Sequence, residues 1–107
     1  MADQLIPRRE MQFQLYEVLD TAGLCSRTRF NEHNVETFNA VIDMAEKMAE
    51  EKFLPHNATA DKNEPTFDGT KVSMIDEVKD AFDTYRGAGF IAGHFDFEEG
   101  GMQLPVT

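Results

Sequence analysis

Three stretches of this chain place apolar residues at the three- and four-residue steps of an amphipathic helix. The clearest stretch begins after Asn34, a favourable N-cap residue, and keeps helical spacing for about five turns with charged residues on its other faces. Glu36 lies in its first turn, facing the positive end of the helix dipole. Pro55 is expected to end or bend this helix, because proline lacks the N–H that a helix interior needs. The apolar positions are Val35, Phe38, Val41, Ile42, Ala45, Met48, Ala49 and Phe53.

Two further helices are predicted on either side of this one. The first runs from about Arg9 to Ala22, with Gly23 as its C-terminal stop. The other runs from about Ile75 to Ala88, and Gly87 and Gly89 weaken its end. Their apolar faces consist of Met11, Leu15, Tyr16, Val18, Leu19 and Ala22 in the first, and of Ile75, Val78, Ala81, Phe82, Tyr85 and Ala88 in the second.

The segments between the helices are predicted to be irregular, apart from one turn. The polar stretch His56–Ser73 contains Asp68-Gly69, a turn signal that allows Phe67 and Val72 to pair as a very short hairpin. Phe90–Phe95 is apolar and interrupted by glycine, as expected of a buried connection. We therefore predict an all-α fold of antiparallel helices with at most one very short β-hairpin.

Composition limits the classes of partner. A chain of 107 residues supports one domain or part of a larger one, and its net charge of −10 repels phosphate backbones and anionic lipid. Nucleic acids and membranes are therefore not expected partners, and solubility is the ordinary interpretation of the charge. The chain has one cysteine, Cys25, and its first nine residues contain no apolar run of signal-peptide length. A reducing, cytoplasmic location is expected.

No residue pattern indicates chemistry. His33, His56 and His94 lie far apart in the sequence without metal-ligand spacing, so each is expected to be exposed or locally hydrogen-bonded. Cys25 has no identifiable base, so an inert thiol is favoured over a nucleophile. The acidic run from Asp61 begins like a calcium loop but has the wrong residues at three required positions. Those three residues are Pro65, Thr66 and Val72.

The methionines permit two interpretations. At helical spacing they are favoured as core filler over a promiscuous docking groove. The five methionines concerned are Met11, Met44, Met48, Met74 and Met102. We therefore predict no catalytic, cofactor-binding or metal-binding residue in this chain.

Four segments, taken in order, resemble the N-terminal region of acyl-CoA dehydrogenases, in particular the long bacterial branch that includes methylmercaptopropionyl-CoA dehydrogenase. Pro7–Leu19 is similar to that branch's Pro-x-Arg-Asp-Met-x-Phe-x-Leu-x-Glu-Leu-Leu, and Ala49–Asn57 to its Ala-Glu-Glu-x-Leu-x-Pro-Leu-Asn. Val78–Phe90 resembles Phe-x-x-Ala-Tyr-x-x-Phe-x-x-x-Gly-Trp, and Glu98–Pro105 resembles Glu-Tyr-Gly-Gly-Gln-Gly-Leu-Pro. Three positions depart from the family pattern: Phe90 replaces tryptophan, Glu99 tyrosine and Gln103 glycine.

The resemblance implies an oxidoreductase of fatty acid metabolism, with an N-terminal helical domain, a β-barrel and a C-terminal four-helix domain. It implies that residues 1–33 are a helical extension and connection, and that residues 34–107 are the first part of the N-terminal helical domain. The parent would bind FAD, dehydrogenate an acyl-CoA thioester, pass electrons to an electron-transfer flavoprotein and form a homo-oligomer. The catalytic base and the flavin contacts would lie beyond Thr107, so no FAD is expected on this chain, which by itself would not be an enzyme.

The alternative is a stand-alone acidic helical module, derived from that family, that binds a partner protein. The end of the chain favours the first hypothesis, because Gly100–Pro105 contains no helix stop and no polar tail and is expected to be an interrupted chain. Exposed apolar stripes predict self-association under either hypothesis.

Overall fold

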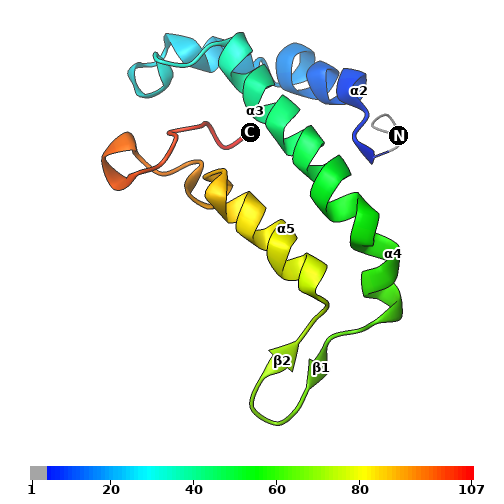
Figure 1. Cartoon of the computed structure of the whole chain (residues 1–107). Coiled ribbons are helices and arrows are strands. Elements are labelled where there is room, and N and C mark those ends of the chain that lie inside the picture. The colour runs from blue at the N-terminus through cyan, green and yellow to red at the C-terminus, as the bar shows by residue number, and fades with distance from the viewer. Residues whose placement is uncertain (1–4) are drawn as a thin grey trace.

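The computed structural model describes residues 5–107, and residues 1–4, the start of the N-terminal stretch that lacks a signal-peptide pattern, lie outside it. The described chain is mostly helical with one short two-stranded antiparallel sheet, which confirms the predicted class (Figure 1). Its α-helices and strands are α2 (Arg8–Gln12), α3 (Val35–Met48), α4 (Leu54–Lys62), β1 (Thr66–Phe67), β2 (Val72–Ser73) and α5 (Asp76–Gly87).

Helix α3 begins as its sequence predicts. Asn34 has an extended backbone, and its side-chain Oδ1 accepts a hydrogen bond of 2.8 Å from the N–H of Thr37, one of the donors that a helix start leaves free. Phe38, one turn further on, is among the few buried side chains of the described chain. The N-cap therefore fixes where the longest apolar stripe starts.

Pro55 was expected to end or bend this helix, and the regular α-helical pattern is interrupted just before it without the chain leaving the helical conformation. A π-helical turn, η4 (Ala49–Phe53), leads from α3 directly into α4, so the first part of the predicted irregular stretch is helical. Within η4 the N–H of Leu54 bonds to the carbonyl of Ala49, five residues back, which places Pro55 in the first turn of a new helix. A first-turn proline loses little, because its missing N–H would have had no helical partner.

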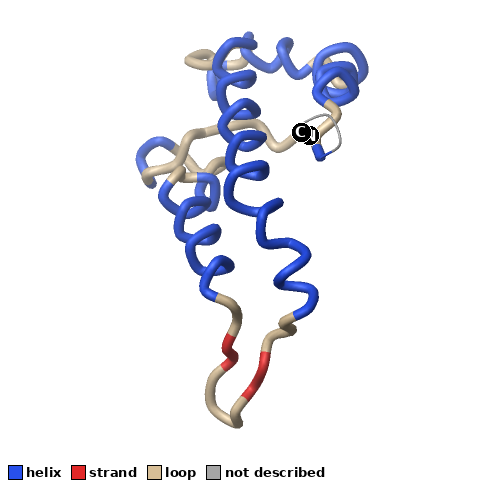
Figure 2. Tube along the Cα trace, turned by 45° about the vertical axis from the view of Figure 1, so that its right-hand side comes forward, coloured by secondary structure: helices blue, strands red, loops and turns tan. Residues whose placement is uncertain are grey.

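The predicted hairpin is confirmed. Phe67 pairs with Val72 across an antiparallel ladder, and Asp68 closes the turn between them. The Asp68 carboxylate accepts hydrogen bonds from the N–H groups of Lys71 at 2.7 Å and of Thr70 at 2.8 Å. Those backbone hydrogen bonds lower the pKa of the Asp68 carboxyl group. Figure 2 shows the hairpin connecting the end of α4 to the start of α5.

The first helix ends earlier than predicted. It comprises α2 and a π-helical turn, η1 (Phe13–Val18), and the chain turns at Asp20, whose φ of 49° is left-handed. Gly23 is therefore not the helix stop but part of a 3₁₀ turn, η2 (Thr21–Ser26), that follows. Aspartate tolerates the left-handed region better than most residues, and the turn carries Thr21 into the interior.

Ion pairs attach this N-terminal helix to α3. Arg8 lies 2.6 Å from a carboxylate oxygen of Asp43 and 2.7 Å from one of Glu46. Tyr16 donates a hydrogen bond of 2.7 Å to the side chain of Asn39, and its partial burial raises the pKa of its hydroxyl group. Arg8 and Tyr16 therefore attach this helix to α3 between Asn39 and Glu46.

Helix α5 runs back alongside α3 within one residue of its predicted bounds. Ala81, on its apolar face, is 1% exposed, and Gly89 ends it with a left-handed φ of 86°. The segment after it was predicted to be buried, and this is wrong for Ile91 and Phe95, which are 50% and 46% exposed. No segment within residues 5–107 covers the side chains of Ile91 and Phe95.

The described chain does not close a compact core. Its accessible surface is 7726 Å², whereas a compact protein of 12.1 kDa exposes about 6000 Å². Its radius of gyration is 16.9 Å, against about 13 Å for a compact chain of this length. The buried apolar residues are Phe38, Met48 and Ala81. About 1700 Å² of surface is thus exposed in excess of a compact fold.

Candidate functional site

The last eight residues, Gly100–Thr107, which we call the strap, fold back onto the start of the chain. The backbone N–H groups of Gln103 and Leu104 bond to the carbonyls of Phe95 and Gly93, each at 2.9 Å. The Gln103 side chain accepts a hydrogen bond of 3.0 Å from the N–H of Phe97 and donates one of 2.7 Å to the carbonyl of Arg29. Gln103 thereby links the strap to Arg29, which lies 74 positions earlier in the chain.

His33 holds the strap from the other side. Its Nε2 lies 2.9 Å from the carbonyl oxygen of Met102 and 3.1 Å from that of Gln103. Because both neighbours are acceptors, Nε2 carries the proton and donates to them. The ring is buried between Phe38 and Phe97, with centroids 5.8 and 6.0 Å away.

The prediction that each histidine is exposed or locally bonded is therefore wrong for His33. Its Nδ1 is buried and has no hydrogen-bond partner within residues 5–107. The prediction is confirmed for His56, whose Nδ1 lies 2.7 Å from the carbonyl of Lys52, and for His94, which is exposed. Long-range burial of one histidine leaves no signal in sequence spacing, since it depends on where the strap returns.

Two glycines allow the strap to turn. Gly100 has a left-handed φ of 86°. A Cβ added to Gly101 would lie 2.2 Å from the carbonyl oxygen of Phe95 and 2.6 Å from that of Ala92. Only glycine permits that approach of two backbone segments. Arg29 and Asp96 add an ion pair of 2.6 Å across the same junction.

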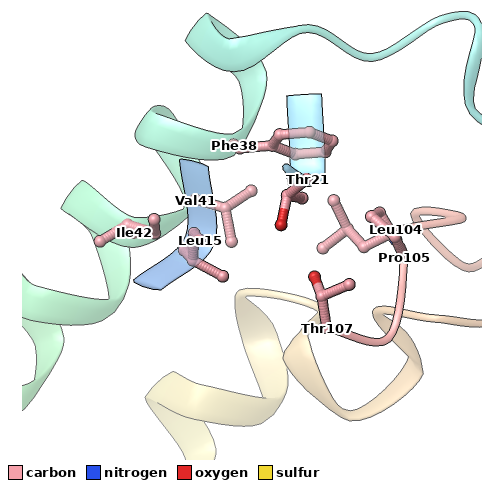
Figure 3. A pocket seen from close by; sticks show the side chains of 8 residues that line it. All are labelled: Leu15, Thr21, Phe38, Val41, Ile42, Leu104, Pro105 and Thr107. Atoms are coloured by element: carbon pink, nitrogen blue, oxygen red, sulfur yellow. The ribbon is translucent and has the colours of Figure 1, made fainter. Parts of the chain in front are cut away.

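The strap closes one side of a pocket, which we call the strap pocket (Figure 3). Its volume is about 190 Å³, and none of its eight lining side chains is charged. Thr21 is 3% exposed, and its hydroxyl group is shielded from solvent without a hydrogen-bond partner among the described residues. The lining residues are Leu15, Thr21, Phe38, Val41, Ile42, Leu104, Pro105 and Thr107.

A second apolar depression lies between the two long helices. It has a volume of about 230 Å³ and shares Phe90 with a neighbouring depression of about 170 Å³. Phe90 stacks on Tyr85 with ring centroids 5.5 Å apart. The larger of these two depressions is lined by Ala45, Met48, Ala49, Phe53, Tyr85 and Phe90.

The methionines, predicted to be core filler, differ in how far they are buried. Met48 is buried and fills the core, whereas Met44 and Met74 are 51% and 54% exposed. Core filling is confirmed only for Met48 and is wrong for the two exposed residues. Of these three, only Met48 belongs to the predicted apolar face of a helix, and Met74 precedes the start of α5.

The reactive residue types do not assemble into a site. Within residues 5–107, no group of three or more His, Cys, Asp or Glu side chains could hold a metal ion. Cys25 is a free, half-buried thiol in η2, and Asp61 lies in the last turn of α4 rather than in a loop. The described helices include none long and apolar enough to cross a membrane.

Sequence reasoning missed the residues that organise this region. Thr21 falls outside the predicted apolar periodicity, because the early turn at Asp20 carries it inward. Gln103 and His33 act through contacts about 70 positions apart, which no local pattern reveals. Comparison of the chain with protein-family models, curated proteins and solved structures finds no match.

Proposed function

We propose that this chain is the N-terminal helical segment of an FAD-dependent acyl-CoA dehydrogenase, and that it contributes structure rather than chemistry. The observation that carries this proposal is the excess exposed surface of about 1700 Å². A standard protein interface buries about 800 Å² on each partner, so the excess is roughly two such interfaces. A surface of this kind is expected of a segment covered on more than one side by the remainder of its protein.

The backbone at Gln103 supports the assignment to this family. Its φ of 52° is left-handed, a conformation that glycine adopts without steric cost. The family pattern has glycine at this position, and the left-handed conformation of Gln103 is one that a glycine there would adopt readily. The glycines that do match, Gly100 and Gly101, are those that the strap turn requires.

The exposed apolar side chains indicate where the remainder of the protein would pack. They lie along α3, η4, α5 and the turn that follows α5, as expected of helices inside a larger helical domain. In the parent, such helices would help to exclude water from the reacting acyl-CoA and flavin. The extension Pro7–Ala22 would brace a domain or subunit surface, and residues 34–107 would form the first part of the helical domain. The exposed apolar residues of these elements include Met44, Phe53, Phe82, Tyr85, Ile91 and Phe95.

The parent would remove a proton and a hydride from adjacent carbons of an acyl-CoA thioester, with FAD as hydride acceptor and an electron-transfer flavoprotein as the next carrier. It would act in the cytoplasm as a homo-oligomer. The base and the flavin contacts belong to other segments of the parent. This chain would therefore contribute no catalytic residue.

The absorption spectrum of the purified 107-residue chain tests this division of roles. We expect no flavin band after expression in flavin-replete cells or after incubation with excess FAD. A stoichiometric flavin that remains through gel filtration would contradict the proposal. The control is a full-length acyl-CoA dehydrogenase carried through the same steps, which should retain its flavin.

The alternative is a stand-alone helical module that binds a partner protein through the same exposed faces. The observation in its favour is the strap, because His33 and Gln103 close the N- and C-terminal parts of the chain onto each other. The mass of the native polypeptide separates the two proposals. A parent enzyme would be several times larger than 12.1 kDa, and a stand-alone module would have that mass.

A further inference from the structure

Helix α5 has a second apolar side besides the one that packs through Ala81. Its residues recur at steps of three, four and three positions, the spacing of one side of a coiled coil. Phe82 and Tyr85 are exposed, and the other two are half-buried. We call this side the α5 stripe, and it consists of Ile75, Val78, Phe82 and Tyr85.

The β-hairpin extends the α5 stripe at its N-terminal end. A groove of about 550 Å³ lies between β2 and α5, and the hairpin side of it contributes Val72 and Met74, both exposed. From Ile75 to Tyr85 the stripe is about 15 Å long, at 1.5 Å of rise per residue. Stripe and groove together therefore match one side of an amphipathic helix of about three turns.

The charges beside the α5 stripe differ in sign from the chain as a whole. Lys79 and Arg86 each directly follow a stripe residue, and both are exposed. They share one carboxylate, because Asp83 lies 2.6 Å from the Nζ of Lys79 and 3.2 Å from a guanidinium nitrogen of Arg86. Lys71 and Asp76 line the groove as well. Three cations and two anions therefore lie along the stripe and groove, in a chain with a net charge of −10.

We propose that the α5 stripe binds an amphipathic helix with acidic flanks, supplied by the remainder of the parent protein. Lys79 and Arg86 have eight N–H donors between them, and one shared carboxylate leaves most of these for acceptors on the incoming helix. A basic helix would be attracted by the net charge at long range but would meet like charges within the Debye length of about 8 Å. The choice of the parent as the source of the helix rests on the proposed function.

A second copy of this chain matches the same stripe less well. Two antiparallel α5 helices would bring together the margins that carry Lys79 and Arg86, which have like charges. Two parallel helices would place these cations opposite Ala81 and Ala88, which offer no ion pair. Self-association through Phe82 is therefore expected to be weaker than the binding of an acidic helix.

Fluorescence anisotropy with three labelled helical peptides tests the charge preference. Each peptide is two heptads long with leucine at the a and d positions, and the flanking e and g positions are all glutamate, all glutamine or all lysine. We expect the glutamate peptide to bind about 2- to 30-fold more tightly than the glutamine peptide, the factor for two exposed ion pairs. The lysine peptide should bind most weakly. Equal affinities, or tightest binding by the lysine peptide, would overturn the proposal.

Charge substitutions in the chain locate the preference. Lys79→Gln combined with Arg86→Gln should bring the glutamate and glutamine peptides to equal affinity, and Lys79→Glu combined with Arg86→Glu should reverse the order. The matched control is Arg27→Glu combined with Lys47→Glu, which changes the net charge equally at two exposed cations outside the stripe and should preserve the order. A preference that persists in the neutral variant, or that the control also reverses, would overturn the proposal whether or not the reversed variant folds.

Two further measurements identify the occupant. The glutamate peptide should dissociate the self-associated chain in sedimentation experiments, and self-association that withstands saturating peptide would assign the stripe to a second copy. Tyr85→benzoylphenylalanine in the native polypeptide should give a photochemical link within the same polypeptide, whereas a link to a different polypeptide would overturn the parent as the source. A native mass of 12.1 kDa would refute that source together with the proposed function, and the peptide order tests the chemistry of the stripe separately.

Discussion

Substitution of Gly101 by alanine should detach the strap. The added methyl carbon would lie 2.2 Å from the carbonyl oxygen of Phe95 and 2.6 Å from that of Ala92, both far inside ordinary contact. Neither neighbour is a flexible side chain that could rotate away, so the backbone itself must move. The strap would then lose the hydrogen bonds that Gln103 and Leu104 make to the same region.

The size of this effect follows from what the movement breaks. Two backbone hydrogen bonds contribute about 0.5–1.5 kcal/mol each, and overpacking typically costs about 1–3 kcal/mol. We expect Gly101→Ala to lower the free energy of unfolding by about 2–6 kcal/mol. A loss of that size is a large part of the marginal stability of a small domain.

Urea unfolding followed by circular dichroism measures this loss, and a second glycine provides the control. A Cβ added to Gly87, at the end of α5, would meet nothing within 4 Å. Gly87→Ala should therefore stabilise the chain by about 0.4–1 kcal/mol, through the reduced entropy of the unfolded state. If Gly101→Ala left the free energy of unfolding within about 0.5 kcal/mol of the unchanged chain, the close approach of the strap would be refuted.

Three further predictions concern a buried group, a turn and an exposed face. Thr21→Val should raise the free energy of unfolding by about 1 kcal/mol in urea titrations, because it removes a buried hydroxyl group without a partner; a destabilised variant would show that the hydroxyl is bonded. The carboxyl group of Asp68 should titrate below its ordinary value of 3.8 in an NMR pH series. Since its pKa is lowered on folding, its contribution to the hairpin should be present above that ordinary value and be lost as the pH falls through the lowered pKa; titration at or above 3.8 would contradict the turn geometry. Phe82→Asp should reduce self-association in sedimentation experiments, because Phe82 is half exposed on the apolar face of α5; a strictly monomeric unchanged chain would contradict this reasoning.

Local chemistry made part of this fold predictable from the sequence. The start of α3 followed from the capping ability of Asn34, and the hairpin followed from Asp68-Gly69 between two β-forming residues. The bounds of α5 followed from its apolar period and its glycine-rich end. Each of these features is decided by residues a few positions apart.

The errors arose from unexpected local backbone conformations and from contacts between distant residues. Pro55 was expected to end or bend a helix, and the stretch after it was expected to be irregular, but a π-helical turn before Pro55 lets a second helix begin directly. Gly23 was expected to stop the first helix, but Asp20 takes the left-handed conformation three residues earlier. The burial of His33 depends on a strap about 70 positions away, and the exposure of Ile91 depends on the absence of any described cover. Periodicity predicts which face of a helix is apolar, but not whether that face is covered.

The central claim is that this chain is one helical segment of a larger dehydrogenase. The most direct test is the mass of the native polypeptide in its source cells, detected with an antibody raised against residues 34–107. We predict a band several times larger than 12.1 kDa. A single band at 12.1 kDa would contradict the claim and favour the stand-alone binding module.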